Sequence, residues 1–152
     1  MGMLQSMDKH MQPVKMIDVG HKLVTVRTAE ASGSLLLQLK TLEHIRAGEL
    51  AKGDAVNTAR VAGIMAAKRT AEFVPLCHPL PLDAVDVDIR FEKGGDGRRA
   101  AVTATAKVVT SAKTGVEMEA LTAVSTACLT LYDMLKAAQK DMEISSVRLT
   151  RK

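Results

Sequence analysis

A stripe of small polar side chains, with an acid at each end, runs along one face of a helix expected at residues 116–141. At about 100° per residue, its five members fall within roughly 80° of one another. They are Glu119, Thr122, Thr126, Thr130 and Asp133. A solvent-facing stripe is one interpretation, although such faces usually carry Lys, Glu and Gln. Short threonines between two carboxylates favour a groove for a ligand or a partner helix.

A proline-rich segment at residues 74–81 is the second place where chemistry could occur. Its three prolines exclude a helix or a central strand and leave backbone N–H groups free to meet a ligand. His78 within it could act as an acid, a base or a donor to phosphate. A structural turn with a surface histidine is the alternative. Cys77 has no neighbouring base in sequence, which favours a small buried residue over a nucleophile.

Basic residues near two predicted helix ends could meet an anion. Lys52-Gly53-Asp54 precedes a helix, whose N-terminus favours negative charge, but it lacks the spacing of a nucleotide-triphosphatase loop. Lys68 and Arg69 close that helix, where a simple dipole interaction also accounts for them. No set of His, Cys and carboxylate residues has the spacing of a zinc site.

The elements that would position these residues alternate between strands and helices. Asp54 is a plausible helix N-cap, and Gly48 a helix stop. We expect strands at 25–39 (interrupted near Gly33), 85–91, 102–108 and 144–149, with a hairpin turn at 94–97, and helices at 42–47, 55–70 and 116–141. This order predicts an α+β fold, a ferredoxin-like split βαβ subunit whose antiparallel sheet carries helices on one face.

Length and composition suit one compact domain. The chain has 152 residues, 47% hydrophobic and 25% charged. We expect a flexible tail at residues 1–13 and a single catalytic domain at 14–152. No apolar run suggests a membrane span or a signal peptide, so a cytoplasmic protein is expected. The net charge of +4 is compatible with a phosphorylated ligand. One Tyr, two Phe and no Trp argue against nucleic-acid binding.

Six runs of residues, in unbroken order over 16–152, resemble one known family. They are Met16–Gly20, Lys52–Asp54, Ala59–Thr70, Pro75–Leu80, Thr114–Thr122 and Tyr132–Ala137. They are similar to the molybdenum-cofactor biosynthesis C proteins, the cyclic pyranopterin monophosphate synthases. The resemblance implies a ferredoxin-like subunit in a homo-hexamer, a trimer of dimers, with sites at the dimer interface.

The same resemblance implies a reaction. The substrate would be the purine-derived triphosphate 3',8-cyclo-7,8-dihydro-GTP, converted to cyclic pyranopterin monophosphate with release of pyrophosphate. This would be a lyase reaction in molybdenum cofactor biosynthesis. The family is thought to need no redox cofactor. A magnesium ion carried on the substrate triphosphate stays open, and no metal site is expected in the protein.

The resemblance also implies the site residues. Asp133 matches the family's catalytic residue, and Lys52 and Lys136 match its catalytic lysines. The substrate-binding positions are Leu76, Cys77, His78, Met118, Glu119 and Lys152, with Glu117 and Lys68 as further pocket residues.

We expect Lys52, Lys136 and Lys152 to cluster around the polyanion, with Asp133 poising Lys136 three residues later on the helix. A lysine could also move protons if neighbouring cations lowered its pKa. The alternative function is a non-enzymatic, ferredoxin-like nucleotide-binding regulator, which would need the basic pocket but not Asp133.

Overall fold

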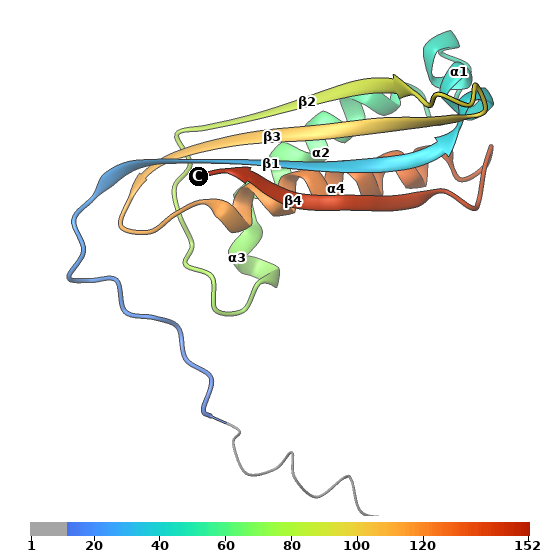
Figure 1. The fold of residues 1–152 in the computed structure, drawn as a ribbon. Helices are drawn as coiled ribbons and strands as arrows, with labels where there is room; N and C mark the ends of the chain where they lie inside the picture. The colour runs from blue at the N-terminus through green and yellow to red at the C-terminus, as the bar shows by residue number, and fades with distance from the viewer. Residues whose placement is uncertain (1–11) are drawn as a thin grey trace, which may run out of the picture.

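A computed structural model describes residues 12–152 and shows an α+β fold (Figure 1). Most of the tail predicted at 1–13 lies outside these residues. In chain order the elements are β1 (Thr25–Gln38), α1 (Leu39–Ala47), α2 (Ala55–Lys68), α3 (Thr70–Phe73), β2 (Ala84–Lys93), β3 (Arg99–Ala112), α4 (Glu117–Leu135) and β4 (Glu143–Arg151). The four strands lie in the order β2-β3-β1-β4, and each neighbouring pair is antiparallel. This is the order of the split βαβ arrangement, so the predicted fold class is confirmed.

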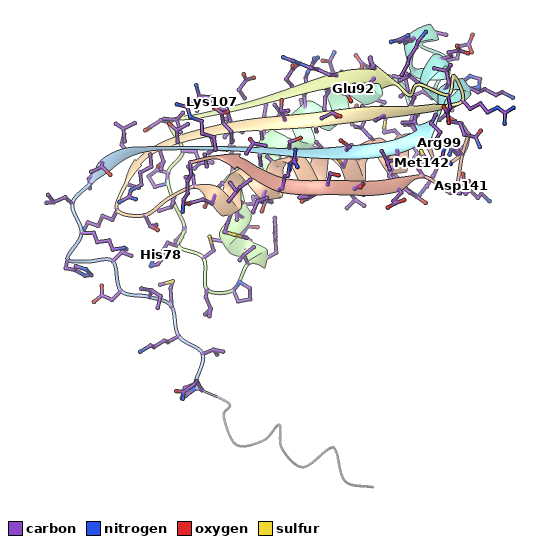
Figure 2. All side chains as sticks on the ribbon, in the orientation of Figure 1. His78, Glu92, Arg99, Lys107, Asp141 and Met142 are labelled. Atoms are coloured by element: carbon purple, nitrogen blue, oxygen red, sulfur yellow. The ribbon has the colours of Figure 1, made fainter. Side chains whose placement is uncertain are left out.

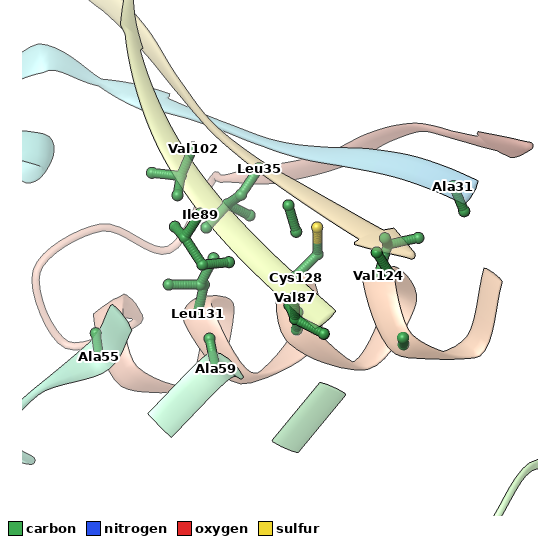
Figure 3. Packing of buried hydrophobic residues seen from close by; sticks show 14 of the residues in the cluster. Ala31, Leu35, Ala55, Ala59, Val87, Ile89, Val102, Val124, Cys128 and Leu131 are labelled. Carbon is green, nitrogen blue, oxygen red and sulfur yellow. The ribbon is translucent and has the colours of Figure 1, made fainter. Parts of the chain in front are cut away.

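Helices α2 and α4 cover one face of the sheet (Figure 1). Alternate side chains of the strands point to that face and are buried, as the period of two predicts. Figure 3 shows the result: Val124, Cys128 and Leu131 of α4 pack beneath the sheet. Leu35 and Val102 of the two central strands are fully buried. The core therefore lies between the sheet and α4.

Small residues allow α2 and α4 to pack closely. Ala59 is fully buried, and Gly63 lies against the other helix. A Cβ atom added at Gly63 would stand 2.9 Å from the backbone oxygen of Ala123 and 3.5 Å from the Cβ of Ala127. The small side chains of α2 therefore allow the backbones of α2 and α4 to approach closely.

The local signals at helix ends are confirmed. Asp54 caps α2, because its Oδ1 accepts a hydrogen bond from the backbone N–H of Asn57 at 3.0 Å. Gly48 ends α1 in the left-handed conformation, at φ 68°. The predicted hairpin turn after residue 93 joins β2 to β3, with Gly97 at φ 67°.

Three features of the predicted elements differ from the structure. Strand β1 is continuous through Gly33, where only its pairing with β4 shifts register. Helix α4 ends at Leu135 rather than at residue 141. Its chain turns away because Gln139 bonds elsewhere: its Oε1 accepts from the N–H of Gln38 at 2.9 Å and from the hydroxyl of Thr41 at 2.8 Å.

The 55–70 helix is also shorter than predicted, ending at Lys68 before the separate turn α3. Among residues 12–152, no helix is long and apolar enough to cross a membrane.

Candidate functional site

Asp133 lies between two lysines near the C-terminal end of α4. Its Oδ2 accepts from Lys52 Nζ at 2.7 Å, and its Oδ1 contacts Lys136 Nζ at 2.8 Å. All three side chains are about half exposed, with relative accessibilities of 50%, 51% and 56% for Lys52, Asp133 and Lys136. One carboxylate thus holds two ammonium groups where a ligand can reach them.

The loop before α2 brings Lys52 to this place. Gly48 ends α1, Gly53 has φ 92°, and the Asp54 cap fixes the start of the next helix. Helix α2 packs on α4, so the loop before it lies beside the end of α4. Lys136 follows directly after α4, three residues beyond Asp133 on the same side of the helix.

The charges of this cluster are fixed by its contacts. The hydrogen bond to Lys136, with that to Lys52, lowers the pKa of Asp133 to about 2. The same carboxylate raises the pKa of Lys136. Asp133 is therefore an anion and Lys136 a cation at neutral pH. A depressed lysine pKa, which a proton-abstracting role would need, is not what this structure shows for Lys136.

A second group of predicted residues meets near the N-terminal end of α4. Leu76, Cys77 and His78 line a cavity of about 340 Å³ together with Glu117 and Met118. His78 Nε2 lies 2.7 Å from the backbone oxygen of Ile17. Since a carbonyl oxygen only accepts, Nε2 carries a proton in this contact. The proline-rich segment thus forms one wall of a hollow.

Glu119 is the most deeply buried acid of the site. Glu119 is only 3% exposed, and its Oε1 accepts a contact from the Sγ of Cys77 at 3.8 Å. No hydrogen-bond partner reaches its Oε2 within residues 12–152. Burial raises the pKa of Glu119, and burial followed by the nearby carboxylate raises that of Cys77. The thiol is therefore poorly suited to be a nucleophile, as the sequence predicts.

Lys68 and Glu119 line a further cavity, of about 280 Å³, beside the proline-rich segment. Lys152 lies elsewhere, on a cavity of about 380 Å³ that also includes Glu117 and Gly115. The described residues therefore place Lys68, His78, Glu119 and Lys152 around one end of α4.

The site residues fall into two groups within one chain. Asp133 lies fourteen positions after Glu119 in α4, which is about 21 Å at 1.5 Å per residue. Figure 2 shows His78 at the end of the molecule opposite Asp141 and Met142, which follow α4. The predicted cluster of three lysines does not form in one chain, because antiparallel β4 carries Lys152 back to the N-terminal end of α4.

The polar stripe of α4 is not a uniform solvent-facing surface. Glu119 and Thr122 are buried, at 3% and 9% exposure, Thr126 and Thr130 are half-buried, and Asp133 is exposed. The hydroxyl of Thr130 donates to the backbone oxygen of Thr126 at 2.8 Å. The stripe therefore leads from a buried acid to an exposed one.

Arg27 is a candidate that sequence reasoning missed. It lies on β1 and lines the same cavity as Lys152. The sequence pattern of β1 could have found it, because alternate side chains of a strand point to the same face. Arg27 lies on the same face as Ala29 and Ala31, which are each 1% exposed. A charged residue in such a series marks a place where the core meets a ligand or solvent.

Comparison with known proteins places this chain among relatives that share one name. The model of the MoaC family matches residues 16–152. The chain is 51% identical over 138 residues to the cyclic pyranopterin monophosphate synthase of Parvibaculum lavamentivorans, covering 91% of this chain and 84% of that protein. It is 53% identical over 137 residues to the synthase of Methylobacterium nodulans, covering 90% and 83%.

A relative in Mycobacterium tuberculosis, cyclic pyranopterin monophosphate synthase 3, is 50% identical over 151 residues, which are 99% of this chain and 82% of that protein. The family resemblance found in the sequence is thus confirmed over nearly the whole chain. This chain belongs to the MoaC family.

Proposed function

We propose that this protein is a cyclic pyranopterin monophosphate synthase. It converts 3',8-cyclo-7,8-dihydro-GTP to cyclic pyranopterin monophosphate and releases pyrophosphate, an early step of molybdenum cofactor biosynthesis. Relatives of about 50% identity bear that enzyme's name. The observation that supports catalysis most directly is the contact of Asp133 with both Lys52 and Lys136.

The reaction needs charge and mobile protons at one place. A substrate hydroxyl attacks the first phosphorus, a new P–O bond forms, and the bond to the pyrophosphate group breaks. The hydroxyl proton passes to solvent or to the departing pyrophosphate, on which negative charge grows. Lys52 and Lys136 stabilise that charge, and as cations they can donate a proton to a leaving oxygen or ring nitrogen. Asp133 orients both ammonium groups and favours the protonated form of Lys136.

The residues near the N-terminal end of α4 hold the purine-derived part. The cavity bounded by Leu76, Cys77, His78 and Met118 has apolar walls with few polar groups, which suits a flat heterocycle. Glu119, buried and without a cation partner within the described residues, is held towards its neutral form. It can then donate a hydrogen bond to the heterocycle, or a proton during ring opening.

Two copies of the chain together form each site in this proposal. Asp133 and Glu119 lie about 21 Å apart along one helix, so one copy does not bring both to one reacting centre. An interface that sets the Asp133 end of one copy beside the His78 cavity of another joins them. We therefore propose the homo-hexamer, a trimer of dimers, that the family resemblance implies.

Neither a redox cofactor nor a resident metal is part of the proposal. Any magnesium ion would arrive on the substrate triphosphate, and the enzyme would work in the cytoplasm. Within residues 12–152, no group of three or more His, Cys, Asp or Glu side chains is placed to hold a metal ion.

A direct assay tests this function. The purified protein is mixed with 3',8-cyclo-7,8-dihydro-GTP, and pyrophosphate and cyclic pyranopterin monophosphate are measured. We expect the two products in equal amounts. Binding of the nucleotide without either product would contradict the proposal and support the nucleotide-binding regulator instead.

A further inference from the structure

The side chain of Gln139 joins the segment after α4 to the start of α1. Its Oε1 accepts the backbone N–H of Gln38 at 2.9 Å and the hydroxyl of Thr41 at 2.8 Å. Its Nε2 donates to the Oδ1 of Asp141 at 2.9 Å. Figure 1 shows α1 and the end of α4 at the same end of the molecule, where Figure 2 labels Asp141. One amide thus ties together residues that lie 101 and 98 positions apart in the sequence.

The amide oxygen of Gln139 acts as a cap for α1. The first N–H groups of a helix have no partner within the helix, and an N-cap side chain usually supplies an acceptor. The N-cap residue Gln38 makes no such bond with its own side chain. Thr41 lies in the first turn and is only 3% exposed, so its hydroxyl would lose a buried partner if the amide of Gln139 were removed. The first turn of α1 is therefore held by a residue that follows α4.

A second set of contacts holds the same segment against α4. The hydroxyl of Tyr132 donates to the backbone oxygen of Lys140 at 2.6 Å, and Tyr132 packs against the core. The backbone N–H of Gln139 donates to the oxygen of Leu135 at 3.2 Å. Lys136 lies between these anchored positions, so its backbone is fixed on both sides.

Together these contacts close a ring through the candidate site. Gln139 lies three residues after Lys136, whose Nζ contacts Asp133 at 2.8 Å. On the other side, Gln139 holds the start of α1, which fully buried Leu42 anchors in the core. Helix α1 leads through the following loop to Lys52, whose Nζ contacts the second carboxylate oxygen of Asp133 at 2.7 Å. Both lysines therefore stand on segments that the amide of Gln139 joins.

We propose that Gln139 is a positioning residue for the reaction: by bonding α1 to the segment after α4, its amide sets the separation of Lys52 and Lys136 across Asp133. Gln139 acts through these three side chains and not on the substrate itself. This inference rests on the proposed function for the reaction that the cluster serves. The geometry that Gln139 sets is a property of the free protein and is measured without substrate.

Carbon NMR of the aspartate carboxyl groups, in protein without substrate, gives the first test. Gln139→Met keeps the length of the side chain but removes its bonds to α1. The pKa of Asp133 is about 2 in the wild type, because Lys136 and Lys52 donate to it, and we expect it to rise towards its ordinary value of 3.8 in this variant. The signal is assigned by its loss in Asp133→Asn. Gln38→Met is the matched control, since this exposed side chain caps nothing, and it should leave the pKa of Asp133 unchanged.

Turnover gives the second test, because a displacement of about 1 Å at reacting groups can lower a rate about 100-fold. We expect Gln139→Met to lower kcat at least about tenfold and to change KM by less than about threefold, since the cavity beside His78 is not altered. Gln139→Glu combined with Asp141→Asn exchanges donor and acceptor between the two partners and keeps the bonds to α1. This double variant should therefore recover the wild-type kcat.

A purely structural role for Gln139 predicts a different pattern. Gln139→Met would then lower the unfolding free energy but leave kcat and the pKa of Asp133 at their wild-type values, and this result would overturn the proposal. A shifted pKa with unchanged kcat would equally remove the role in the reaction. If Gln139→Met does not fold, Gln139→Asn decides, because its amide is one methylene too short to reach both α1 and Asp141. Wild-type kcat and an unchanged pKa of Asp133 in that variant would be contrary as well.

The NMR measurement separates this inference from the proposed function. If the wild type releases no pyrophosphate while the pKa of Asp133 still depends on Gln139, the function is rejected. The positioning of the two lysines and Asp133 by Gln139 then stands.

Discussion

At the scale of single residues, Asp133 governs two lysines at once. An amide in its place keeps the size of the side chain but cannot hold two cations, so Lys52 and Lys136 lose their common partner. We expect Asp133→Asn to lower pyrophosphate release at least about 100-fold while the fold persists. The control is Asp86→Asn, an exposed acid on the other face of the sheet. Near-wild-type turnover of Asp133→Asn would remove the catalytic role.

A substitution that keeps the positive charge of Lys136 tests whether this residue donates a proton. Arginine retains the positive charge but does not release a proton at physiological pH. We expect Lys136→Arg to lose most of its kcat while its KM changes by less than about threefold, because binding needs charge and the proton step needs an acid. A steady-state rate curve measures both. Full activity would show that Lys136 only binds phosphate.

The buried side chain of Glu119 makes the stability of the fold depend on pH. Its pKa is raised by burial, so the native state holds a proton more tightly than the unfolded chain. The neutral acid stabilises the native state at pH values below the pKa of Glu119 in the unfolded chain, near 4.5. This stabilisation is lost as the pH rises through the higher pKa of Glu119 in the native state. Glutamine does not titrate. We therefore compare the unfolding free energy of Glu119→Gln with that of the wild type. The variant should gain more over the wild type at pH 8 than at pH 4.

Denaturant unfolding at both pH values measures this difference. Exposed Glu92→Gln is the control, and it should show no such dependence. An equal stability difference between Glu119→Gln and the wild type at the two pH values would mean that ionised Glu119 carries no burial penalty.

Residue types that could do chemistry were visible in the sequence, but their partners were not. The family resemblance named Asp133 and Lys152 as candidates without showing that they lie at opposite ends of α4. Their separation follows from strand direction, which only the assembled sheet reveals. Arg27 had a signal in the β1 alternation that became clear once its cavity was known.

At the scale of elements, the contact of α2 with α4 sets the distance from Lys52 to Asp133. A methyl group at Gly63 would press on the backbone of Ala123, which cannot move alone. Overpacking typically costs about 1–3 kcal/mol, against about 1 kcal/mol gained from helix propensity. We expect Gly63→Ala to reduce the unfolding free energy and to lower turnover by moving α2.

Gly95→Ala provides the comparison, because a Cβ at Gly95 meets nothing within 4 Å. Denaturant unfolding of both variants gives the measurement. A Gly63→Ala variant that matches the wild type in stability and turnover would show that the helix contact is not tight enough to position the site.

Periodicity predicted most elements because one face of each is buried and the other is not. Strands β2 and β3 alternate clearly, and Asp54 and Gly48 mark helix ends through local backbone chemistry. The position at which α4 ends could not be predicted from such local patterns. Ala137 and Ala138 favour a longer helix, whereas the hydrogen bonds of Gln139 to β1 and α1 come from residues about 100 positions away in sequence.

At the scale of the whole molecule, the fold places the candidate site residues at two ends of a subunit. The sheet order places β4 beside β1, so Lys152 and Arg27 approach each other, and α4 carries Asp133 away to the other end. In our proposal, a second copy of this subunit completes each site. The proposed oligomer would then be part of the active site.

Mixing two inactive variants tests this central claim most directly. Asp133→Asn damages one end of the subunit and Glu119→Gln the other, and each alone should release almost no pyrophosphate. If sites form between copies, subunits exchanged at random restore about a quarter of the sites. We predict recovery of roughly that fraction of wild-type pyrophosphate release after unfolding and refolding the two variants together. Verified mixed oligomers without any recovered activity would contradict a site shared between copies.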